Sequence, residues 1–323
     1  MENHMLQTLI EIDRRIPDAL RTAFGICYHR PEPVPGQQDE VANFAAVLLG
    51  PRDDDGGGGS DPMDCDEPAP PPGGLRMVFD SCYIKDHDED AHFGHAAAGV
   101  LGVADGVGGF RDKCVDASAF ARGLMNYAYT EVVTAPPGTP VCPRTLLERA
   151  HQMAVAAGTP AASTAVIVSL AGGALRWAYV GDSGFVVFRD GRALRRSQPQ
   201  QHYFNCPYQL SSRGDSSRVD ADAEVGEVAA KDGDIVVVGT DGLFDNVTGD
   251  ELERIVRMGT ALGFSPKNMA EVISGFAFEA SRCSNRDTPY SVLARREPGR
   301  AFLSGGKPDD ITVVVAYIVS SCF

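Results

Sequence analysis

Four apolar segments of the chain each lead into or out of an aspartate. Asp105 ends the run VLGVAD, Asp182 follows AYVG, Asp241 follows VVVGT, and the pair Asp309 and Asp310 precedes ITVVVAYIV. If these segments are strands whose ends meet, several carboxylates lie beside a low-dielectric core, and their charge must be compensated by protons or cations. Carboxylate oxygens are hard ligands, so the expected chemistry is binding of Mg²⁺ or Mn²⁺. The sequence has no cluster of histidines and cysteines, which argues against zinc.

The glycine-rich turn after Asp105 fits the same chemistry. Gly106 has no side chain, so its backbone carbonyl can approach an ion closely, and Gly108 and Gly109 keep the loop open for a substrate. Any single Asp-Gly pair is explained by ordinary turn chemistry. The joint pattern at several strand ends is what favours a catalytic site.

The elements that must position these acids can be read from the pattern of apolar residues. Strands rich in Val, Ile and aromatic residues are expected at 76–84, 98–104, 164–170, 175–181, 185–189, 234–239 and 311–319. Helices are expected at 117–133, 144–157, 249–262 and 266–282, the third opened by a capping box at Thr248 and the fourth by Ser265-Pro266. Runs of strands and consecutive pairs of helices indicate an α+β fold rather than a doubly wound sheet.

Composition limits the class of protein. The net charge of −15, without a block of Lys or Arg, argues against binding to nucleic acid or to an anionic membrane, and no apolar run reaches the ~18 residues of a membrane span. The eight cysteines form no CxxC pair, which favours a reducing compartment. Acidic residues near the start argue against a secretory signal or a transit peptide. We expect an intracellular monomer, in the cytoplasm or nucleus by default, with an organelle left open.

Three parts of the chain differ in composition. Residues 53–74, DDDGGGGSDPMDCDEPAPPPGG, contain almost nothing that can be buried, and they predict a disordered linker. Residues 1–52 are interpreted as an N-terminal extension without an assigned role. The folded domain is expected to span 75–323.

Five motifs, in this order, resemble the metal-dependent serine/threonine phosphatases of the protein phosphatase 2C family, most closely its plant branch. They are HDEDAHF (87–93), GVADGVGGF (102–110), VGDSGF (180–185), GTDGLFDN (239–246) and GGKPDDITVVVAY (305–317). The resemblance spans roughly Arg76 to Tyr317 and implies a four-layer αββα sandwich, in which helix pairs flank two antiparallel sheets. It also implies a two-metal site in the channel between the sheets.

The resemblance assigns ligands for two Mg²⁺ or Mn²⁺ ions. Asp105 bridges both ions, the carbonyl of Gly106 holds one, and Asp241 and Asp309 hold the other. A water activated between the two ions then attacks the phosphorus of phosphoserine or phosphothreonine in a phosphoprotein, without a covalent phosphoenzyme.

Further acids are implied around this pair of ions. Glu89 and Asp90 bind or orient waters of the metals. Asp182 and Asp245, together with Asp241, match the positions that the family uses for a third, weaker ion.

Two positions depart from the family pattern. Lys85 stands where the family often has an arginine; it is expected to bind the substrate phosphate as a point charge, and a solvated lysine at a strand end explains it equally well. Val107 stands where many members have a histidine that is the proposed general acid. General acid catalysis contributes ~10²–10⁴-fold, and valine has no proton to donate.

Two other functions compete with that of an active protein phosphatase. The departures at Lys85 and Val107 are compatible with an inactive phosphatase-fold protein that regulates or binds, although the intact set of Asp105, Asp241 and Asp309 argues against it. A metallohydrolase of small phosphomonoesters is the third hypothesis, which the sequence does not separate from the first.

Overall fold

The computed structural model describes residues 74–108, 116–212 and 218–321. The predicted extension, all of the predicted linker except Gly74, and Gly109 of the glycine-rich turn lie outside the described residues. The first strand begins at Leu75.

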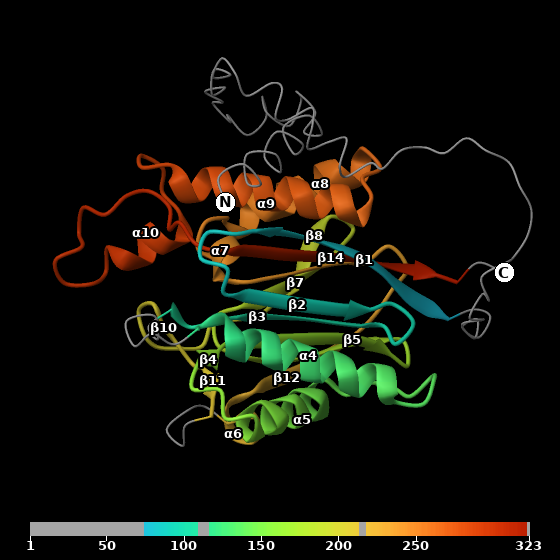
Figure 1. Cartoon of the computed structure of the whole chain (residues 1–323). Coiled ribbons are helices and arrows are strands. Elements are labelled where there is room, and N and C mark those ends of the chain that lie inside the picture. The colour runs from blue at the N-terminus through green and yellow to red at the C-terminus, as the bar shows by residue number, and fades with distance from the viewer. Residues whose placement is uncertain (1–73, 109–115, 213–217, 322–323) are drawn as a thin grey trace, which may run out of the picture. The chain divides into compact units, whose positions relative to one another are not determined.

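Two five-stranded sheets form the centre of the fold (Figure 1). The first has the order β1 (Leu75–Ile84), β14 (Ile311–Ser320), β13 (Ile235–Gly239), β7 (Gly184–Arg189) and β8 (Arg192–Arg196). The second has the order β12 (Glu224–Ala229), β6 (Ala174–Val180), β5 (Ala165–Ala171), β3 (Val100–Asp105) and β2 (Asp90–His95). All neighbouring strands in both sheets are antiparallel, as predicted.

Helices cover the outer faces of the two sheets. The pair α4 (Ser118–Thr134) and α5 (Pro143–Ala156) packs on the second sheet, while α9 (Pro266–Arg282) packs on β1 and β14, and α8 (Gly249–Ala261) contacts β8 and α9. Short elements complete the fold: α6 (Val219–Asp222), α7 (Asp241–Phe244), α10 (Pro289–Ala294), β4 (Ala162–Ser163) paired with β11 (Leu210–Ser211), and β9 (Gln201–Tyr203) paired with β10 (Cys206–Pro207). The predicted α+β sandwich with four layers is therefore confirmed (Figure 1).

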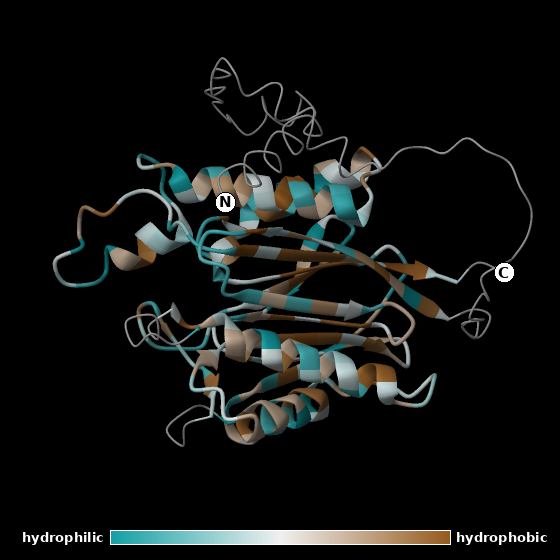
Figure 2. Cartoon of the chain, in the orientation of Figure 1, coloured by the Kyte–Doolittle hydropathy of each residue, from teal (hydrophilic) through white to brown (hydrophobic). Residues whose placement is uncertain are grey.

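The central strands are buried on both faces, which explains their continuous apolar sequences. On β3, Val100 and Ala104 join the core beneath α4 and α5, whereas Leu101 and Val103 join the core between the sheets. Successive side chains of a strand point to opposite faces, so a strand between two cores has no polar side. Figure 2 shows the resulting hydrophobic strands in the middle of the sandwich.

The predicted helix boundaries are largely confirmed, and the strands that were not predicted include β2 and β12 of the second sheet. Thr248 forms a capping box with Glu251 at the start of α8, and the side chain of Ser265 accepts a hydrogen bond from the backbone N–H of Asn268 at the start of α9. The strand β2 was missed because its sequence is largely polar or charged, and β12 because it is an edge strand with mostly exposed side chains.

Candidate active site

Strand register brings polar side chains of both sheets into the space between them. On β3, Asp105 has the same parity as Leu101 and Val103, whose side chains lie in the core between the sheets. On β2, Asp90 has the opposite parity to Phe93, which lies under the helices. Because side chains alternate along a strand, both aspartates face the first sheet. Asp90 and Asp105 are also directly paired across β2 and β3.

Hydroxyl groups of the first sheet hold the carboxylate of Asp90. Thr240 Oγ1, just before α7, and Thr312 Oγ1, on β14, donate hydrogen bonds of 2.8 and 2.7 Å to Asp90 Oδ2. Thr240 and Thr312 are fully buried and Asp90 is 4% exposed. The two sheets are therefore joined at this end by polar contacts rather than by apolar packing.

The predicted metal-binding aspartates come together here and interact electrostatically. We call this set the acid cluster; it comprises Asp90, Asp105, Asp182, Asp241, Asp245 and Asp309. Burial, reinforced by the neighbouring carboxylates, raises the pKa of Asp182 to about 7, that of Asp245 to about 8 and that of Asp309 to about 6. The same causes raise the pKa values of Asp90 and Asp105 well above the ordinary value. The cluster therefore holds protons at neutral pH in the absence of added cations.

Lys307 lies among three members of the acid cluster. Its Nζ is 2.5 Å from Asp241 Oδ2, 3.0 Å from Asp309 Oδ2 and 3.2 Å from Asp245 Oδ2. Burial raises the pKa of Asp241, but the charge and hydrogen bond of Lys307, together with hydrogen bonds from Asp105 and the backbone of Gly242, hold that pKa below the ordinary value. Lys307 lies within the motif GGKPDDITVVVAY, and its sequence context assigned no role to it. No local signal distinguishes it from a solvated lysine.

Three oxygens of the acid cluster have unmet bonding capacity. Asp90 Oδ1, Asp182 Oδ1 and Asp241 Oδ1 are buried and accept no hydrogen bond. A buried acceptor without a partner costs about 1–3 kcal/mol, more when it is charged. The described residues contain no preformed group of three or more His, Cys, Asp or Glu side chains in metal-binding geometry. The donor chemistry nevertheless fits hard divalent cations, because all the unmet atoms are carboxylate oxygens.

Gly106 is required by the close approach of two backbone segments. A Cβ at this position would lie 2.5 Å from the carbonyl oxygen of Ala117 and 2.8 Å from that of Glu89. The N–H of Gly106 donates to the Glu89 carbonyl at 3.2 Å. Glu89 itself is only 7% exposed. The turn after Asp105 is thus packed directly against the segment that carries Glu89 and leads into β2.

Asp310 fixes the loop that leads into β2, a role that the sequence analysis missed. Its Oδ1 accepts hydrogen bonds from the backbone N–H groups of Asp86, His87 and Asp88 at 2.6, 2.9 and 3.0 Å, and its Oδ2 accepts one from Glu89 at 2.7 Å. The side chain is almost fully buried. An ionised carboxylate in such a nest of N–H groups makes strong hydrogen bonds.

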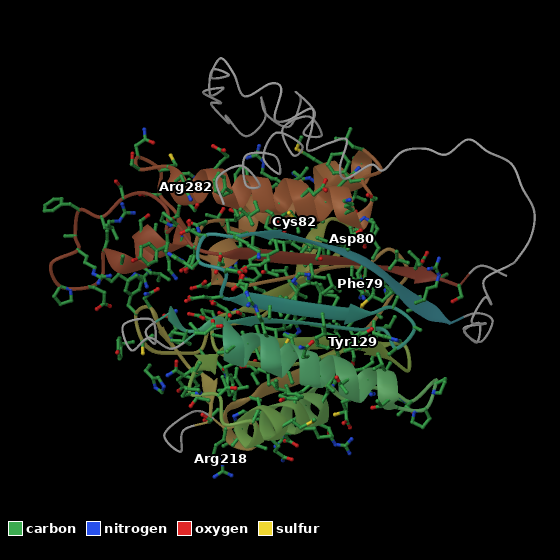
Figure 3. The ribbon with its side chains drawn as sticks, viewed as in Figure 1. Phe79, Asp80, Cys82, Tyr129, Arg218 and Arg282 are labelled. Atoms are coloured by element: carbon green, nitrogen blue, oxygen red, sulfur yellow. The ribbon has the colours of Figure 1, made fainter. Side chains whose placement is uncertain are left out.

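The same loop is also tied to helix α9. Arg282, labelled at the end of α9 in Figure 3, forms an ion pair of 3.0 Å with Asp86 and lies over the ring of Phe278. The segment that carries Glu89 and Asp90 is therefore fixed from both sides.

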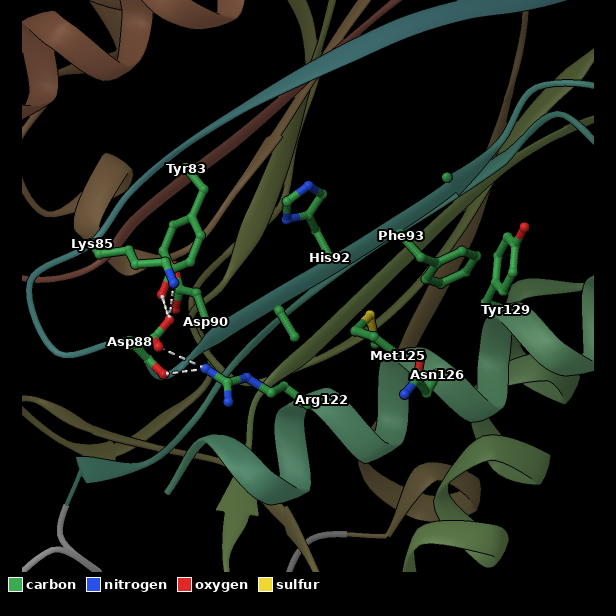
Figure 4. Close-up of a pocket in the computed structure, with 12 residues that line it drawn as sticks. Tyr83, Lys85, Asp88, Asp90, His92, Phe93, Arg122, Met125, Asn126 and Tyr129 are labelled. Atoms are coloured by element: carbon green, nitrogen blue, oxygen red, sulfur yellow. Dashed lines mark hydrogen bonds and ion pairs between the residues drawn. The ribbon is translucent and has the colours of Figure 1, made fainter. Parts of the chain in front are cut away.

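A groove of about 650 Å³ opens beside the acid cluster, between β2, the end of β1 and helix α4 (Figure 4). Asp90 lines one end and Tyr129 the other. Lys85 Nζ lies 2.8 Å from Asp88 Oδ1, and Arg122 Nη2 lies 3.0 Å from Asp88 Oδ2. Lys85 is therefore at the groove and not among the acids, and the structure adds Arg122, a second cation that the sequence analysis missed.

Comparisons with known sequences find similar plant proteins. Protein phosphatase 2C 24 of Oryza sativa subsp. japonica is 55% identical over 316 residues, which cover 97% of this chain and 98% of the relative. Protein phosphatase 2C 23 of the same organism is 50% identical over 321 residues, 98% of this chain and 96% of the relative. Protein phosphatase 2C 55 of Arabidopsis thaliana is 39% identical over 253 residues, 76% of this chain and 53% of the relative. No protein-family model matches the chain.

Solved structures with a similar fold are also phosphatases. The photosystem II phosphatase PBCP is 32% identical, with a TM-score of 0.65, and the match covers 75% of this chain and 98% of that protein. The catalytic domain of the serine/threonine phosphatase PstP, solved with two manganese ions, is 18% identical with a TM-score of 0.54, and the match covers 76% of this chain and 100% of that domain. The second similarity concerns the fold alone.

Proposed function

Since this chain belongs to the protein phosphatase 2C family, whose members hydrolyse phosphoserine and phosphothreonine in proteins with divalent cations, we propose that the acid cluster is its metal centre. The chain is thus an enzyme, a metal-dependent protein serine/threonine phosphatase. The observation that supports the proposed centre most directly is the set of buried, unpartnered carboxylate oxygens on Asp90, Asp182 and Asp241. The presence of all the predicted acids argues against the inactive alternative.

Asp105, the carbonyl of Gly106, Asp241 and Asp309 would hold two Mg²⁺ or Mn²⁺ ions, and Glu89 and Asp90 would orient their waters. When bound, the two ions supply the Lewis acidity that activates a water for in-line attack on phosphorus.

The chain's own contribution is to fix the acids before the ions arrive. Thr240 and Thr312 orient Asp90 from the opposite sheet, and Asp310 holds the loop that carries Glu89. Electrostatic stabilisation of phosphoryl transfer depends on groups that need little reorganisation, and buried hydrogen bonds provide that rigidity.

The groove of Figure 4 is proposed as the entrance for the phosphoprotein. Lys85 and Arg122 give it two positive charges, of which Asp88 compensates one. A planar guanidinium binds phosphate with two parallel hydrogen bonds, whereas an ammonium acts as a point charge. Arg122 therefore offers the fork that Lys85 lacks, and both would attract the dianionic phosphoryl group.

The metal centre is tested by release of phosphate from a phosphothreonine peptide. Activity is expected with Mn²⁺ or Mg²⁺ and none with EDTA, and Asp105→Asn should reduce it to background in a folded protein. Asp232→Asn is the matched control and should stay active, because Asp232 is an exposed acid at the end of β13 opposite to Asp241. Activity that survives EDTA or Asp105→Asn would show that the chemistry lies elsewhere.

The class of substrate needs a second comparison. A protein phosphatase should have a higher kcat/KM on phosphoproteins than on nucleotides or sugar phosphates. Arg122→Ala should raise KM for a phosphopeptide more than it lowers kcat, since the residue is proposed to bind and not to react. A preference for small phosphomonoesters would favour the third hypothesis of the sequence analysis.

The proposed surroundings are the interior of a cell. The described cysteines Cys82, Cys142, Cys206 and Cys283 are free thiols, which supports a reducing compartment. No helix among the described residues is both long and apolar enough to cross a membrane. The proposed partner is a phosphoprotein substrate and not nucleic acid.

A further inference from the structure

The position of Lys307 raises the question of what its charge does in a metal centre. An ammonium group has three N–H donors and no acceptor. The three carboxylate oxygens around Nζ, from Asp241, Asp245 and Asp309, match that number. The side chain is only 18% exposed. The group thus behaves as a buried cation held by three carboxyl groups, and no donor remains free for the substrate phosphate.

The backbone of Lys307 is fixed to the same element that carries two of these acids. Its N–H donates to Asn246 Oδ1 at 2.8 Å, and its carbonyl accepts from Asn246 Nδ2 at 2.9 Å. Asn246 Nδ2 also donates to the carbonyl of Gly242 in α7, between Asp241 and Asp245. Asn246 is fully buried. The ammonium is therefore tethered to the cluster and does not reach it by chance from a mobile loop.

The oxygens that Lys307 occupies overlap with those implied for a third, weaker metal ion. That ion was assigned to Asp182, Asp241 and Asp245, and the ammonium already contacts Asp241 and Asp245. It also contacts Asp309, a proposed ligand of the ion pair, but among the described residues no contact joins it to Asp105, the acid proposed to bridge that pair. A divalent cation at the same oxygens would meet a like charge at short range in a region of low dielectric, where repulsion is strong. The unpartnered Oδ1 atoms of Asp182 and Asp241 stay available on the other side of each carboxylate.

We propose that Lys307 is a tethered cation that replaces the third metal ion of this centre. The chain then binds two exchangeable divalent ions, and the lysine neutralises the remaining acids permanently. The inference rests on the proposed function only in that the acid cluster must bind divalent cations.

The first test counts metal ions. Mn²⁺ is titrated calorimetrically into the whole protein and the bound metal is measured after equilibrium dialysis, for the natural chain, for Lys307→Met and for the control Lys231→Met, which removes an exposed lysine. We expect two ions per natural chain, two in the control and three in Lys307→Met. Three ions in the natural chain, or two in Lys307→Met, would overturn the inference. A natural chain that binds no Mn²⁺ would instead refute the proposed metal centre.

The second test measures stability without metal. Loss of the ammonium leaves buried carboxylates without their counter-ion, so Lys307→Met in EDTA should melt about 6 °C or more below the natural chain. Saturating Mn²⁺ should close most of that gap, because a third ion replaces the lost charge. An unchanged melting temperature in EDTA would contradict the proposal.

A double variant keeps the test decisive if Lys307→Met does not fold. Lys307→Met with Asp245→Asn removes the ammonium together with one of its three carboxyl partners, which is also one ligand of the implied third site. It should fold, bind two ions and melt above the single variant in EDTA. Three ions in the double variant would overturn the inference, because the third site would then not depend on these residues.

Discussion

Removal of the negative charge of Asp310 tests whether the loop before β2 is held by hydrogen bonds to this one side chain. In Asp310→Asn, one amide oxygen can still face the N–H groups of Asp86, His87 and Asp88, but the amide nitrogen then faces the N–H of Glu89. A hydrogen bond to a charged group contributes about 1.5–3 kcal/mol and one between neutral groups about 0.5–1.5 kcal/mol. One bond is lost, at a cost of about 1.5–3 kcal/mol, and three are weakened by about 1–1.5 kcal/mol each, which sums to roughly 4.5–7.5 kcal/mol.

Two effects reduce this sum. Asp86 and His87 are exposed, so water can replace part of their lost bonding. The substitution also relieves repulsion between Asp310 and Asp90, but this gain is small because the raised pKa of Asp90 already diminishes its charge. We therefore expect a loss of about 3 kcal/mol, which lowers the melting temperature of a domain of this size by about 6–12 °C.

Thermal and urea unfolding in EDTA measure the stability, and phosphopeptide hydrolysis in Mn²⁺ measures the site. Activity should fall with stability, because the loop leads directly to Glu89 and Asp90. Asp232→Asn is the control, because this exposed carboxylate accepts a hydrogen bond from a single backbone N–H, that of Ser320. Removal of its charge should lower the melting temperature by no more than about 2 °C. A similarly small change for Asp310→Asn, with full activity, would refute the reasoning.

Three more predictions follow from the packing and the charges. Gly106→Ala places a Cβ 2.5 Å from a backbone oxygen and should abolish activity and lower the melting temperature. The control is Gly123→Ala on helix α4, where the nearest atom to the added Cβ is 3.8 Å away, and it should be neutral or stabilising by about 0.5–1 kcal/mol. Equal effects in the two variants would contradict the steric argument. Thr312→Val removes a hydrogen bond to the buried carboxyl of Asp90, and urea unfolding should show that the protein is destabilised by about 1–3 kcal/mol. The variant should lose proportionally more kcat than substrate affinity. An unchanged kcat would argue against a positioning role for Thr312. Burial leaves every carboxyl in the cluster except Asp241 with a raised pKa, about 8 at Asp245. The raised groups contribute stability below their unfolded pKa and lose that contribution as pH rises through the folded pKa. The melting temperature in EDTA should therefore fall between pH 5 and pH 8, while the stabilisation by Mn²⁺ should grow over the same range. A melting temperature that does not change with pH would mean that the acids are not buried together.

Local sequence determined the framework of this protein. The apolar runs of β3 and β14 predict strands buried on both faces, and the caps at Thr248 and Ser265 predict the starts of two helices, because periodicity and capping act within a few residues. The aspartates at the strand ends predict a cluster of hard ligands. A strand that runs through an apolar core places its polar residues where it leaves the core, at the edge of the sheet.

Only the tertiary structure decided which charges meet. Lys307 contacts Asp241, which lies 66 positions away in the sequence. Asp310 contacts Glu89 across 221 positions, and Arg122 contacts Asp88 across 34. No periodicity links such distant positions, so a lysine buried among acids and a lysine in solvent have the same local sequence signature. The two are distinguished by the register of the sheets and the path of the loops, which set the distance between charges and, with the local dielectric, the strength of their interaction.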